Sequence, residues 1–566
     1  MDADSLLWSR RVSGGEYLAA SRIIDQAPPL LRETLLARYA DIAGPERRFY
    51  LANGRVLDSW NDAATDLRRT GAQLKQARVS TAFDDDAIET LARRASHFCM
   101  TVALEGATRY AQTQGVAVPR GPRVTNKGQR RRLVSSDWWR RCLRRLMTRH
   151  AEELFRRLGF VRRQTSAYVS GDALERVRQA GRKGQRWLRD MLAVCQDTGE
   201  ALPLAEIAEH SLSNPALRRG ELMLRARGFQ EIAEQRGDRC LMVTATAPSA
   251  FHPWLRDSGE RNPRYNGSTP RQAQAWLNQQ WARARARLKR RGLVYYGIRC
   301  AEPHHDGTPH WHMILYAPRR ELWRLRVILR KVWLKTYSDE PGAPRYRIRF
   351  TTEDPSKGSG AAYIAKYVAK NIDGAGDIGA EVSDESGQRI TEDCERAIAW
   401  ARLHGIRQFQ QLGGPAVGLW RELRRVREPC DCPPLEALRL ATDQTDLSDP
   451  SWSRFILELG GIEASLKQSR SLLDHAEPRC LDRAGRTVMR LNRWGEMPSP
   501  IVVGLRIVWR DRIRRLPTRV HVWILVFSPQ GGLLTLGPVA ITVRGAPGYG
   551  SPTGWTNPNE TSQAPP

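Results

Sequence analysis

The chain has 566 residues, of which 90 are lysine or arginine and 61 are aspartate or glutamate, so its formal net charge is +29. This length allows three or four domains at roughly 150 residues each. Because 41% of the residues are hydrophobic, as in ordinary globular proteins, wholesale disorder is excluded. The excess of basic side chains, most of them arginine, favours a polyanionic partner such as nucleic acid.

The cysteines and the apolar stretches limit the cellular setting. Nine cysteines are scattered along the chain without a CxxC pair, so neither a disulfide scaffold nor a zinc ribbon is expected. Cys430 and Cys432 are interpreted as ordinary loop thiols rather than metal ligands. The N-terminal sequence has acidic residues where a signal peptide has basic ones. No stretch reaches the roughly 18 apolar residues that a membrane-spanning helix needs. We therefore expect a cytoplasmic protein without a membrane partner.

Two regions at the start of the chain are predicted to be helical. Residues 1–118 show helical periodicity without a recognisable motif, and their role stays open. Residues 119–235 form a basic segment, in which eleven lysines or arginines lie between Arg120 and Arg149. This second region is a candidate for DNA contact.

One helix of the basic segment is predicted from the sequence SSDWWRRCLRRLMTRH, with Ser136 or Asp137 as its N-cap. Two interpretations of this helix stay open. In the first, it has a solvated charged face and packs Trp138 and Trp139 inward. In the second, it tracks phosphates and offers these rings for stacking on bases. The arginines that would contact DNA in the second interpretation are Arg140, Arg141, Arg144 and Arg145.

Short strands, turns and two helices are predicted between residues 236 and 374. The alternation in RCLMVTAT predicts a strand with Thr244 and Thr246 on one face, where both are candidates for DNA contact. A helix follows, in which Thr269 and Gln272 form a capping box. Its other face is strongly basic. Its buried stripe is predicted to contain Leu277, Trp281, Ala284 and Leu288.

The runs LVYYGIRC and HWHMILY flank a turn in EPHHDGTP, which predicts a β-hairpin. On its second strand the period of two places His310 and His312 on one face. Glu302 has the corresponding parity on the first strand, so its carboxylate is expected beside the two imidazoles. Such a set can hold a divalent cation and leave coordination positions open, as catalysis requires. We expect His304 and His305, in the turn, to point away from this site towards solvent or DNA.

A second helix is predicted in YIAKYVAKNID, opened by the Gly-Ser-Gly sequence before it. Tyr363 and Tyr367 lie at positions i and i+4, so their phenols share one face. Lys366 and Lys370 form a second row with the same spacing and supply positive charge beside the hydroxyls. Tyrosines with this spacing are by themselves more often core residues. Beside a metal triad they become candidate nucleophiles, because a bound cation polarises phosphorus for attack by a phenolate.

The order of the motifs LMVTAT, EPHHDGTPHWHMILY and YIAKYVAKNID resembles the HUH endonucleases, and in particular the double-tyrosine replication gene A proteins of bacteriophages. The resemblance covers about residues 120–425, with one departure at Ala245, where leucine is expected. It implies an α+β fold in which helices flank the central antiparallel sheet of an HUH nuclease core. A helical N-terminal region and a small C-terminal region with strands would accompany this core. The histidine motif is then expected on a central strand, with the tyrosine helix packed over it.

The resemblance also implies a function and its site residues. Glu302, His310 and His312 would bind Mg²⁺ or Mn²⁺, although two imidazoles suit Mn²⁺ or Zn²⁺ better than Mg²⁺. Tyr363 and Tyr367 would cleave single-stranded or supercoiled origin DNA through 5′-phosphotyrosine links, start rolling-circle replication and close the circle. The chain has no phosphate-binding loop motif of a helicase motor, so a host helicase and a host DNA polymerase are expected as partners.

The predicted domain order places the nuclease core at residues 236–374 and a helical extension of it at 375–429. Residues 430–544 form a C-terminal region, in which VHVWILVF and LLTLGPVAITV are expected to pair as a hairpin across a Gly-Gly turn. Residues 545–566 have the composition of a disordered tail. The nick-site sequence, the oligomeric state, the order in which the tyrosines act, and the roles of residues 1–118 and 430–566 stay open.

Two other functions also stay open. A double-tyrosine HUH transposase would use the same triad and the same tyrosine helix. A non-catalytic protein that binds an origin or packages DNA would be equally basic, and the histidines of its hairpin would be structural. A covalent adduct with DNA separates both enzymes from the binding protein.

Overall fold

The computed structural model describes most of the chain from residue 85 onwards. The described residues are 49–50, 56–57, 85–353, 359–374, 386–387, 389–443, 451–481, 487–519, 521–528 and 542–544. Of the predicted helical region 1–118, most of residues 1–84 lie outside the described residues. The whole predicted tail, residues 545–566, lies outside them as well. Two short strands, β1 (Phe49–Tyr50) and β2 (Val56–Leu57), pair with each other.

The centre of the fold is an antiparallel sheet of five strands in the order β8-β5-β7-β6-β9. β5 is the predicted strand with the two threonines, and β6 and β7 are the predicted hairpin. β7 is the central strand, as expected for the strand that carries the histidine motif. The strands are β5 (Asp238–Thr246), β6 (Tyr296–Pro303), β7 (Pro309–Pro318), β8 (Ile348–Thr352) and β9 (Phe409–Leu412).

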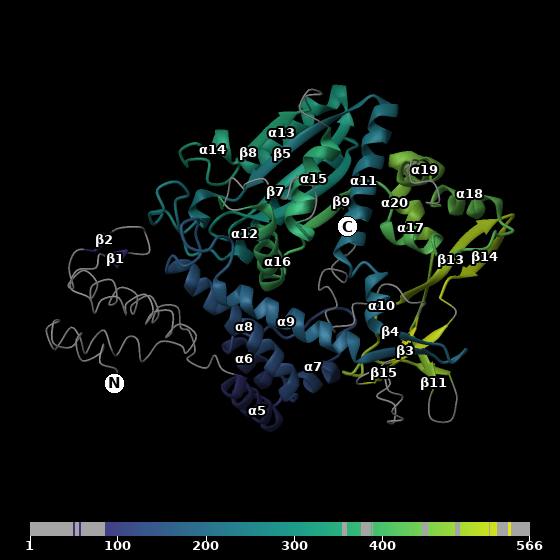
Figure 1. The fold of residues 1–566 in the computed structure, drawn as a ribbon, viewed down its shortest axis with the longest axis horizontal. Coiled ribbons are helices and arrows are strands. Elements are labelled where there is room, and N and C mark those ends of the chain that lie inside the picture. Colours follow the sequence, from purple (N-terminus) through teal and green to yellow (C-terminus); the bar gives the residue numbers. More distant parts are fainter. Residues whose placement is uncertain are drawn as a thin grey trace.

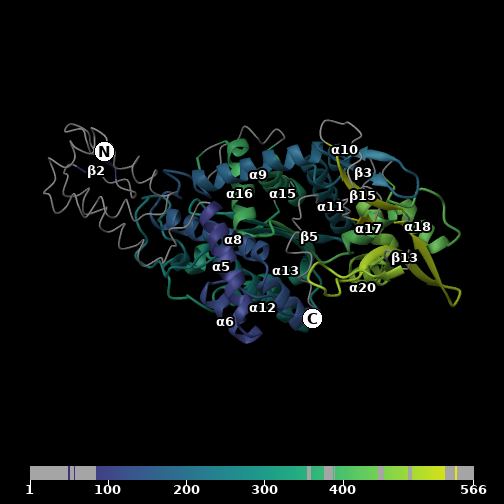
Figure 2. The same cartoon turned by 90° about the horizontal axis from the view of Figure 1, so that it is seen from below.

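Helices cover both faces of this sheet, because both faces are apolar. Val243 and Met313 point towards one face and pack against α12 and α13. Ile314 and Tyr316 point towards the other face, which α11 and α15 cover. The helices are α11 (Pro215–Arg236), α12 (Pro270–Arg290), α13 (Leu322–Trp333) and α15 (Gly360–Ile372). Figure 2 shows α15 and α12 on opposite sides of β5. This is the predicted α+β arrangement.

The helix α12 begins where the sequence predicts. Thr269 Oγ1 accepts a hydrogen bond from the backbone N–H of Gln272 at 3.3 Å, and Gln272 Oε1 accepts one from the N–H of Thr269 at 2.8 Å. The capping box is therefore confirmed. The predicted buried stripe is confirmed as well, because Leu277, Trp281, Ala284 and Leu288 are all buried. The arginines of the helix are consequently left on its outer face.

A unit of four helices precedes the sheet and has its own apolar core. Figure 1 shows these helices gathered below the sheet. They are α5 (Asp85–Thr101), α6 (Leu104–Thr113), α7 (Asn126–Leu133) and α8 (Ser136–Arg157). α8 is the predicted basic helix, but its N-cap is Ser135, whose hydroxyl accepts from the backbone N–H of Trp138. The predicted caps, Ser136 and Asp137, are instead its first two helical residues.

Trp138 and Trp139 pack as the first interpretation of α8 expects. Their exposed fractions are 7% and 0%, and both rings lie in the core of the helical unit. The Nε1–H of Trp139 donates to the backbone carbonyl of Leu133 at 2.7 Å. The rings are therefore packed inward and do not offer a stacking surface for bases.

One small sheet brings a late strand of the chain beside an earlier one. The predicted strand at VHVWILVF is β15, and it pairs with β16, as expected, but also with β3. The turn between β15 and β16 lies outside the described residues. Among the helices that the structure describes, none is both long and apolar enough to cross a membrane. The remaining elements are α9 (Gly171–Arg189), β3 (Met191–Cys195), β4 (Ala201–Pro203), α10 (Leu204–Glu209), α14 (Ala343–Tyr346), α16 (Ile390–His404), α17 (Val417–Leu423), α18 (Pro433–Ala441), α19 (Ser451–Glu458), α20 (Gly461–Ser471), β10 (Leu473–Ala476), β11 (Arg479–Leu481), β12 (Thr487–Met489), β13 (Ile501–Trp509), β14 (Arg512–Pro517), β15 (Val522–Phe527) and β16 (Thr542–Arg544).

Gly297 in β6 is required by the close approach of β7. Its φ is +150°, and a Cβ atom at this position would collide with the backbone carbonyl oxygen of Ile314. We expect Gly297→Ala to lower the free energy of unfolding by about 2 kcal/mol or more, because a backbone obstruction cannot move aside as a side chain does. Urea denaturation measures the change.

Gly220 in α11 provides the matched control. It is exposed, and a Cβ atom there meets nothing within 4 Å. Gly220→Ala should raise the free energy of unfolding by about 0.5–1 kcal/mol, because alanine is the better helix former. Equal denaturation midpoints for the two variants would contradict the expectation.

Candidate active site

The register of the central sheet brings the three candidate metal ligands together. His310 and His312 share one face of β7, and Glu302 on β6 lies directly opposite His310. Their ligand atoms all lie within 4.8 Å of one another. His310 Nε2 and His312 Nε2 are 2.9 Å apart, and His312 Nε2 is 3.8 Å from Glu302 Oε2. Strand pairing alone is therefore enough to assemble the triad.

The chemistry of this triad fits a divalent cation. All three side chains are buried, with exposed fractions of 1% for Glu302, 3% for His310 and 9% for His312. Two imidazole nitrogens that face each other need a proton or a cation between them, because their lone pairs repel. Two nitrogens and a carboxylate oxygen are donors that Mn²⁺ and Zn²⁺ accept, whereas Mg²⁺ prefers oxygen donors alone. The residues present would therefore hold such an ion.

The two threonines of β5 have different surroundings. Both lie opposite the histidines in the register of β5 and β7. Thr244 Oγ1 is 3.3 Å from His312 Nδ1, so Thr244 belongs to the edge of the site. Thr246 Oγ1 instead donates to the backbone carbonyl of Arg347 at 3.3 Å. Ala245 is fully buried on the opposite face, so the departure from the family pattern lies in the core.

The helix α15 places both tyrosines over the triad. Ser359 is its N-cap. A Cβ atom at Gly360 would lie 2.6 Å from Tyr316 Oη, so only glycine lets the start of the helix lie this close to the sheet. The buried side of α15 rests on the sheet, which leaves Tyr363 and Tyr367 half-buried and beside β7.

The phenols contact the histidines directly. Tyr363 Oη is 3.1 Å from His312 Nδ1, and Tyr367 Oη donates to Tyr363 Oη at 3.2 Å. The ring of Tyr367 stacks on that of His312 with a centroid distance of 3.9 Å and an interplanar angle of 17°. Both hydroxyls therefore lie at the edge of the triad.

Burial raises the pKa of both tyrosines. For Tyr363, hydrogen bonds with Tyr367 and Thr244 oppose the effect of burial on the pKa. For Tyr367, the neighbouring Tyr363 and Glu302 add to the effect of burial, so its pKa is raised further. Both phenols are therefore protonated at neutral pH in the resting site. A nearby positive charge is needed before either can act as a nucleophile.

Two further residues of α15 hold Glu302 in place. Lys370 Nζ is 3.7 Å from Glu302 Oε2, and Asn371 Nδ2 donates to Glu302 Oε1. The same amide donates to the backbone carbonyl of Tyr367 at 2.8 Å, and Gln408 Nε2 donates to Asn371 Oδ1 at 2.7 Å. Burial by itself lowers the pKa of Lys370, but the charge of Glu302 outweighs burial and raises it. The ammonium therefore stays charged against the carboxylate.

The two lysines predicted to assist the tyrosines are placed differently. Lys370 is buried in the site, whereas Lys366 is only partly buried one turn earlier. Asn371 was missed by the sequence analysis, although its position carried a signal. It follows Tyr367 by four residues, and therefore lies on the same face of the helix as the tyrosines.

The turn of the hairpin does not face solvent, which corrects the prediction for His304 and His305. The ring of His304 stacks on that of His310, with centroids 3.9 Å apart. His305 is 3% exposed. His304 therefore forms part of the wall of the site, and His305 is enclosed by the fold.

Contacts from distant helices explain this burial of the turn. The guanidinium of Arg156 in α8 donates to the backbone carbonyl of Asp306 and to Thr308 Oγ1, both at 2.7 Å. Trp400 Nε1 in α16 donates to the carbonyl of Gly307 at 2.8 Å. Local sequence in the turn cannot reveal these partners, because they come from elsewhere in the chain.

The four arginines predicted to contact DNA on α8 are of two kinds. Arg140 and Arg144 form ion pairs with neighbouring aspartates at 2.8 Å and 2.9 Å. Arg141 and Arg145 are exposed. DNA contact at this helix stays a prediction.

A second basic surface lies between α12 and α13, on the side of the sheet opposite α15. It is a groove of about 290 Å³, and Ala286 and Val332 form its apolar part. Neither of the two helices contains an aspartate or a glutamate. None of the residues that line the groove is aromatic. The cations that line it are Arg283, Arg287, Arg290 and Lys335.

Comparisons with known proteins agree with the order of these motifs. The family model of the bacteriophage replication gene A protein (GPA) matches residues 62–375. The replication gene A protein of Escherichia phage 186 is 39% identical over 301 residues, which are 53% of this chain and 43% of the relative. A probable replication protein of Pseudoalteromonas phage PM2 is 38% identical over 338 residues, 59% of this chain and 52% of the relative. No solved structure matches.

A third relative comes from a bacterial genome. It is a probable replication endonuclease from a prophage-like region of Salmonella paratyphi A, 35% identical over 343 residues, which are 58% of this chain and 42% of the relative. The chain thus spans about half the length of the curated relatives it matches. Because the family model covers more than half of the chain, including the triad and both tyrosines, the chain belongs to the bacteriophage replication gene A protein family.

Proposed function

We propose that this chain is a metal-dependent, site-specific single-strand DNA endonuclease and strand transferase that nicks a phage origin and starts rolling-circle replication. The observation that carries the proposal is the contact of two phenols, Tyr363 and Tyr367, with a histidine of a buried His-His-Glu set. The names of the relatives support the coarser part, because they describe replication proteins and a replication endonuclease.

The triad would hold the cation whose positive charge the tyrosines need. A divalent cation bound by Glu302, His310 and His312 would polarise the scissile phosphate and stabilise the negative charge that develops on it. Lys370 and Asn371 fix the carboxylate of Glu302, so the donor set is arranged before substrate binds.

Geometry favours Tyr363 as the first nucleophile. Nε2 of His312 is directed into the triad, so the neutral ring carries its proton on Nδ1, 3.1 Å from Tyr363 Oη. The N–H of His312 and the O–H of Tyr367 can both donate to this oxygen. Two hydrogen-bond donors would stabilise a phenolate on Tyr363. Tyr367 donates the hydrogen bond between the two tyrosines, so its own oxygen lacks this support.

In the proposed cleavage, the phenolate oxygen of Tyr363 forms a bond to phosphorus while the bond from phosphorus to the 3′ oxygen breaks. The phenol proton passes to solvent, and the leaving 3′ oxygen takes up a proton from solvent. The free 3′-OH then primes a host polymerase, with a host helicase for unwinding. The bond energy is kept in the phosphotyrosine ester, so rejoining needs no nucleotide hydrolysis.

The second tyrosine allows closure of the circle. After one round, Tyr367 would attack the regenerated junction and release a new 3′-OH. This hydroxyl attacks the ester on Tyr363, joins the strand ends and restores the phenol. The two hydroxyls are 3.2 Å apart, so one triad can serve both steps in turn.

The groove between α12 and α13 supplies a surface for the DNA backbone. Its four cations and lack of acidic neighbours favour phosphate, and its lack of aromatic residues argues against stacking on bases. Because it lies across the sheet from α15, DNA held there flanks the cleaved strand and does not enter the site. We therefore propose that it binds duplex beside the origin nick.

The tyrosines can be tested by covalent capture. Purified protein with Mn²⁺ and single-stranded fragments from the genome that carries the gene should form an SDS-resistant adduct, and EDTA should prevent it. Tyr363→Phe should slow adduct formation by about tenfold, because Tyr367 lacks the hydrogen bond from His312, worth about 1.5 kcal/mol. Tyr367→Phe should retain partial cleavage, because Tyr363 then keeps only the donor from His312. Both single variants should fail to close circles.

The double variant decides the assignment of the nucleophiles. Tyr363→Phe with Tyr367→Phe should form no adduct. An adduct in the double variant would place the nucleophile elsewhere. If the unaltered protein forms no adduct with any of several divalent metals, the non-catalytic binding protein is the correct alternative.

His310→Ala tests the triad. It should weaken Mn²⁺ binding and lower the nicking rate by more than about 100-fold. Removing a residue that only hydrogen-bonds to a metal ligand typically costs about 10–100-fold, and removing the ligand itself should cost more. The melting temperature should change little, and calorimetric titration with Mn²⁺ measures the affinity. His210→Ala, an exposed histidine at the end of α10, is the matched control and should leave both quantities unchanged. A collapsed melting temperature for His310→Ala with unchanged Mn²⁺ binding would support a structural histidine.

The groove is tested by the salt dependence of duplex binding. Changing Arg283, Arg287 and Arg290 to Gln should reduce the slope of log K against log salt by about one unit for each lost phosphate contact. The nicking of short single-stranded substrates should be unaffected.

A matched set of substitutions removes the same charge elsewhere. Arg176, Arg178 and Arg182 lie on α9 and pair with carboxylates at 2.8 Å, 2.7 Å and 2.6 Å. Changing these three to Gln should leave the slope unchanged. An equal fall in slope for both sets would show that net charge, and not the groove, controls binding.

A further inference from the structure

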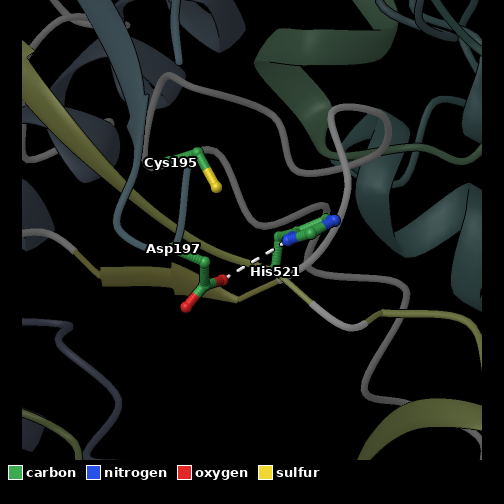
Figure 3. Close-up of side chains that lie close together, drawn as sticks. All are labelled: Cys195, Asp197 and His521. Carbon is green, nitrogen blue, oxygen red and sulfur yellow. Dashed lines mark ion pairs between the residues drawn. The ribbon is translucent and has the colours of Figure 1, made fainter. Parts of the chain in front are cut away.

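A second group of metal-type ligands lies on the small sheet β16-β15-β3-β4, away from the triad. Cys195 is the last residue of β3, Asp197 lies in the turn that follows, and His521 directly precedes β15. Their ligand atoms all lie within 4.8 Å of one another, and His521 Nδ1 is 3.4 Å from Asp197 Oδ2. Figure 3 shows the thiol, the carboxylate and the imidazole around a common space.

Strand pairing explains why these three residues meet. Trp523 on β15 lies opposite Cys195 on β3 in an antiparallel register. Asp197 follows the end of β3 and His521 precedes the start of β15, so both lie just beyond this pair at the same end of the ladder. The turn then brings the carboxylate of Asp197 to the imidazole. The arrangement joins two segments that are far apart in the sequence.

The turn after β3 is closed by backbone hydrogen bonds on both sides of Cys195. The N–H of Cys195 donates to the carbonyl of Glu200 at 2.8 Å. Gly199, with a φ of +73°, completes the turn by donating its N–H to the carbonyl of Cys195 at 3.0 Å.

We propose that Cys195, Asp197 and His521 form a second cation site, which takes a soft divalent metal such as Zn²⁺ and ties β3 to β15. Thiolate, imidazole and carboxylate are the three ligand classes of Zn²⁺, whereas a thiolate is a poor ligand for Mg²⁺ and Ca²⁺. Asp197 and His521 have exposed fractions of 50% and 44%, so water can complete the coordination. This proposal does not depend on the endonuclease proposal, because none of its residues belongs to the triad.

A metal here would support a part of the fold that has little core. The apolar cluster under this sheet is small and includes Leu188, Met191, Trp523 and Leu525. An exposed ion pair such as His521 with Asp197 contributes little stability by itself. Metal binding to folded ligands adds its free energy to folding, so a bound ion would fasten the two strands.

Cobalt provides a specific probe of this site. Full-length protein stripped of metal is titrated with Co²⁺, and the charge-transfer absorption from thiolate to Co²⁺ is recorded. The triad contains no sulfur, so it cannot produce this band. We expect the band to be complete within about two equivalents of Co²⁺ in the unaltered protein, where the triad also takes up cation, and to persist in His310→Ala. Cys195→Ser should abolish the band, and Asp197→Asn and His521→Gln should weaken Co²⁺ binding by more than about tenfold.

The controls separate this site from other thiols and from misfolding. Cys430→Ser, a half-buried thiol beside Cys432, should keep the band, and Zn²⁺ should remove it by competition. Zn²⁺ should also raise the melting temperature of the unaltered protein but not that of His521→Gln, whose replaced side chain is 44% exposed. Absence of the band in the unaltered protein, its survival in Cys195→Ser, or its loss in Cys430→Ser would overturn the proposal.

Discussion

The candidate active site depends on the antiparallel register that places β7 between β5 and β6. This register sets Glu302 opposite His310 and Thr244 opposite His312. A slip of one residue would turn both histidines to the α12 face and bring Trp311 to the site, because side chains alternate along a strand. Trp311 and the apolar residues on its side are fully buried, so their packing opposes such a slip. The packing of the apolar face therefore determines which side chains form the triad on the opposite face.

The site also holds charges that burial makes costly. Glu302 and Lys370 are 1% and 5% exposed, and removing both from water costs more than a pair of apolar residues would. The cost is limited because Asn371 and Gln408 satisfy the polar atoms around the carboxylate. A sheet that served only as a scaffold would have no need of this network. The arrangement is typical of a functional site, where charges are fixed before the substrate arrives.

The parts of the structure that the sequence predicted depend on local patterns. Alternation predicted β5 and the hairpin, and the spacing of Thr269 and Gln272 predicted the start of α12. The common face of His310 and His312 and the pairing with Glu302 follow from the same alternation. The parts that failed depend on partners far away in the chain. The turn that carries His304 and His305 is held by Arg156 of α8 and Trp400 of α16, and no pattern in the turn indicates those helices.

The two faces of the central sheet hold their positive charges in different settings. On the triad side, Lys370 is buried and pairs with the carboxylate of Glu302. The groove cations of α12 and α13 are separated from the triad by the sheet and by a helix about 10 Å wide. At physiological ionic strength exposed charges are screened over about 8 Å, so the groove cations act mainly on charges that lie directly against the groove. The two proposals require this separation, because the groove would bind the DNA backbone and the triad would bind a cation.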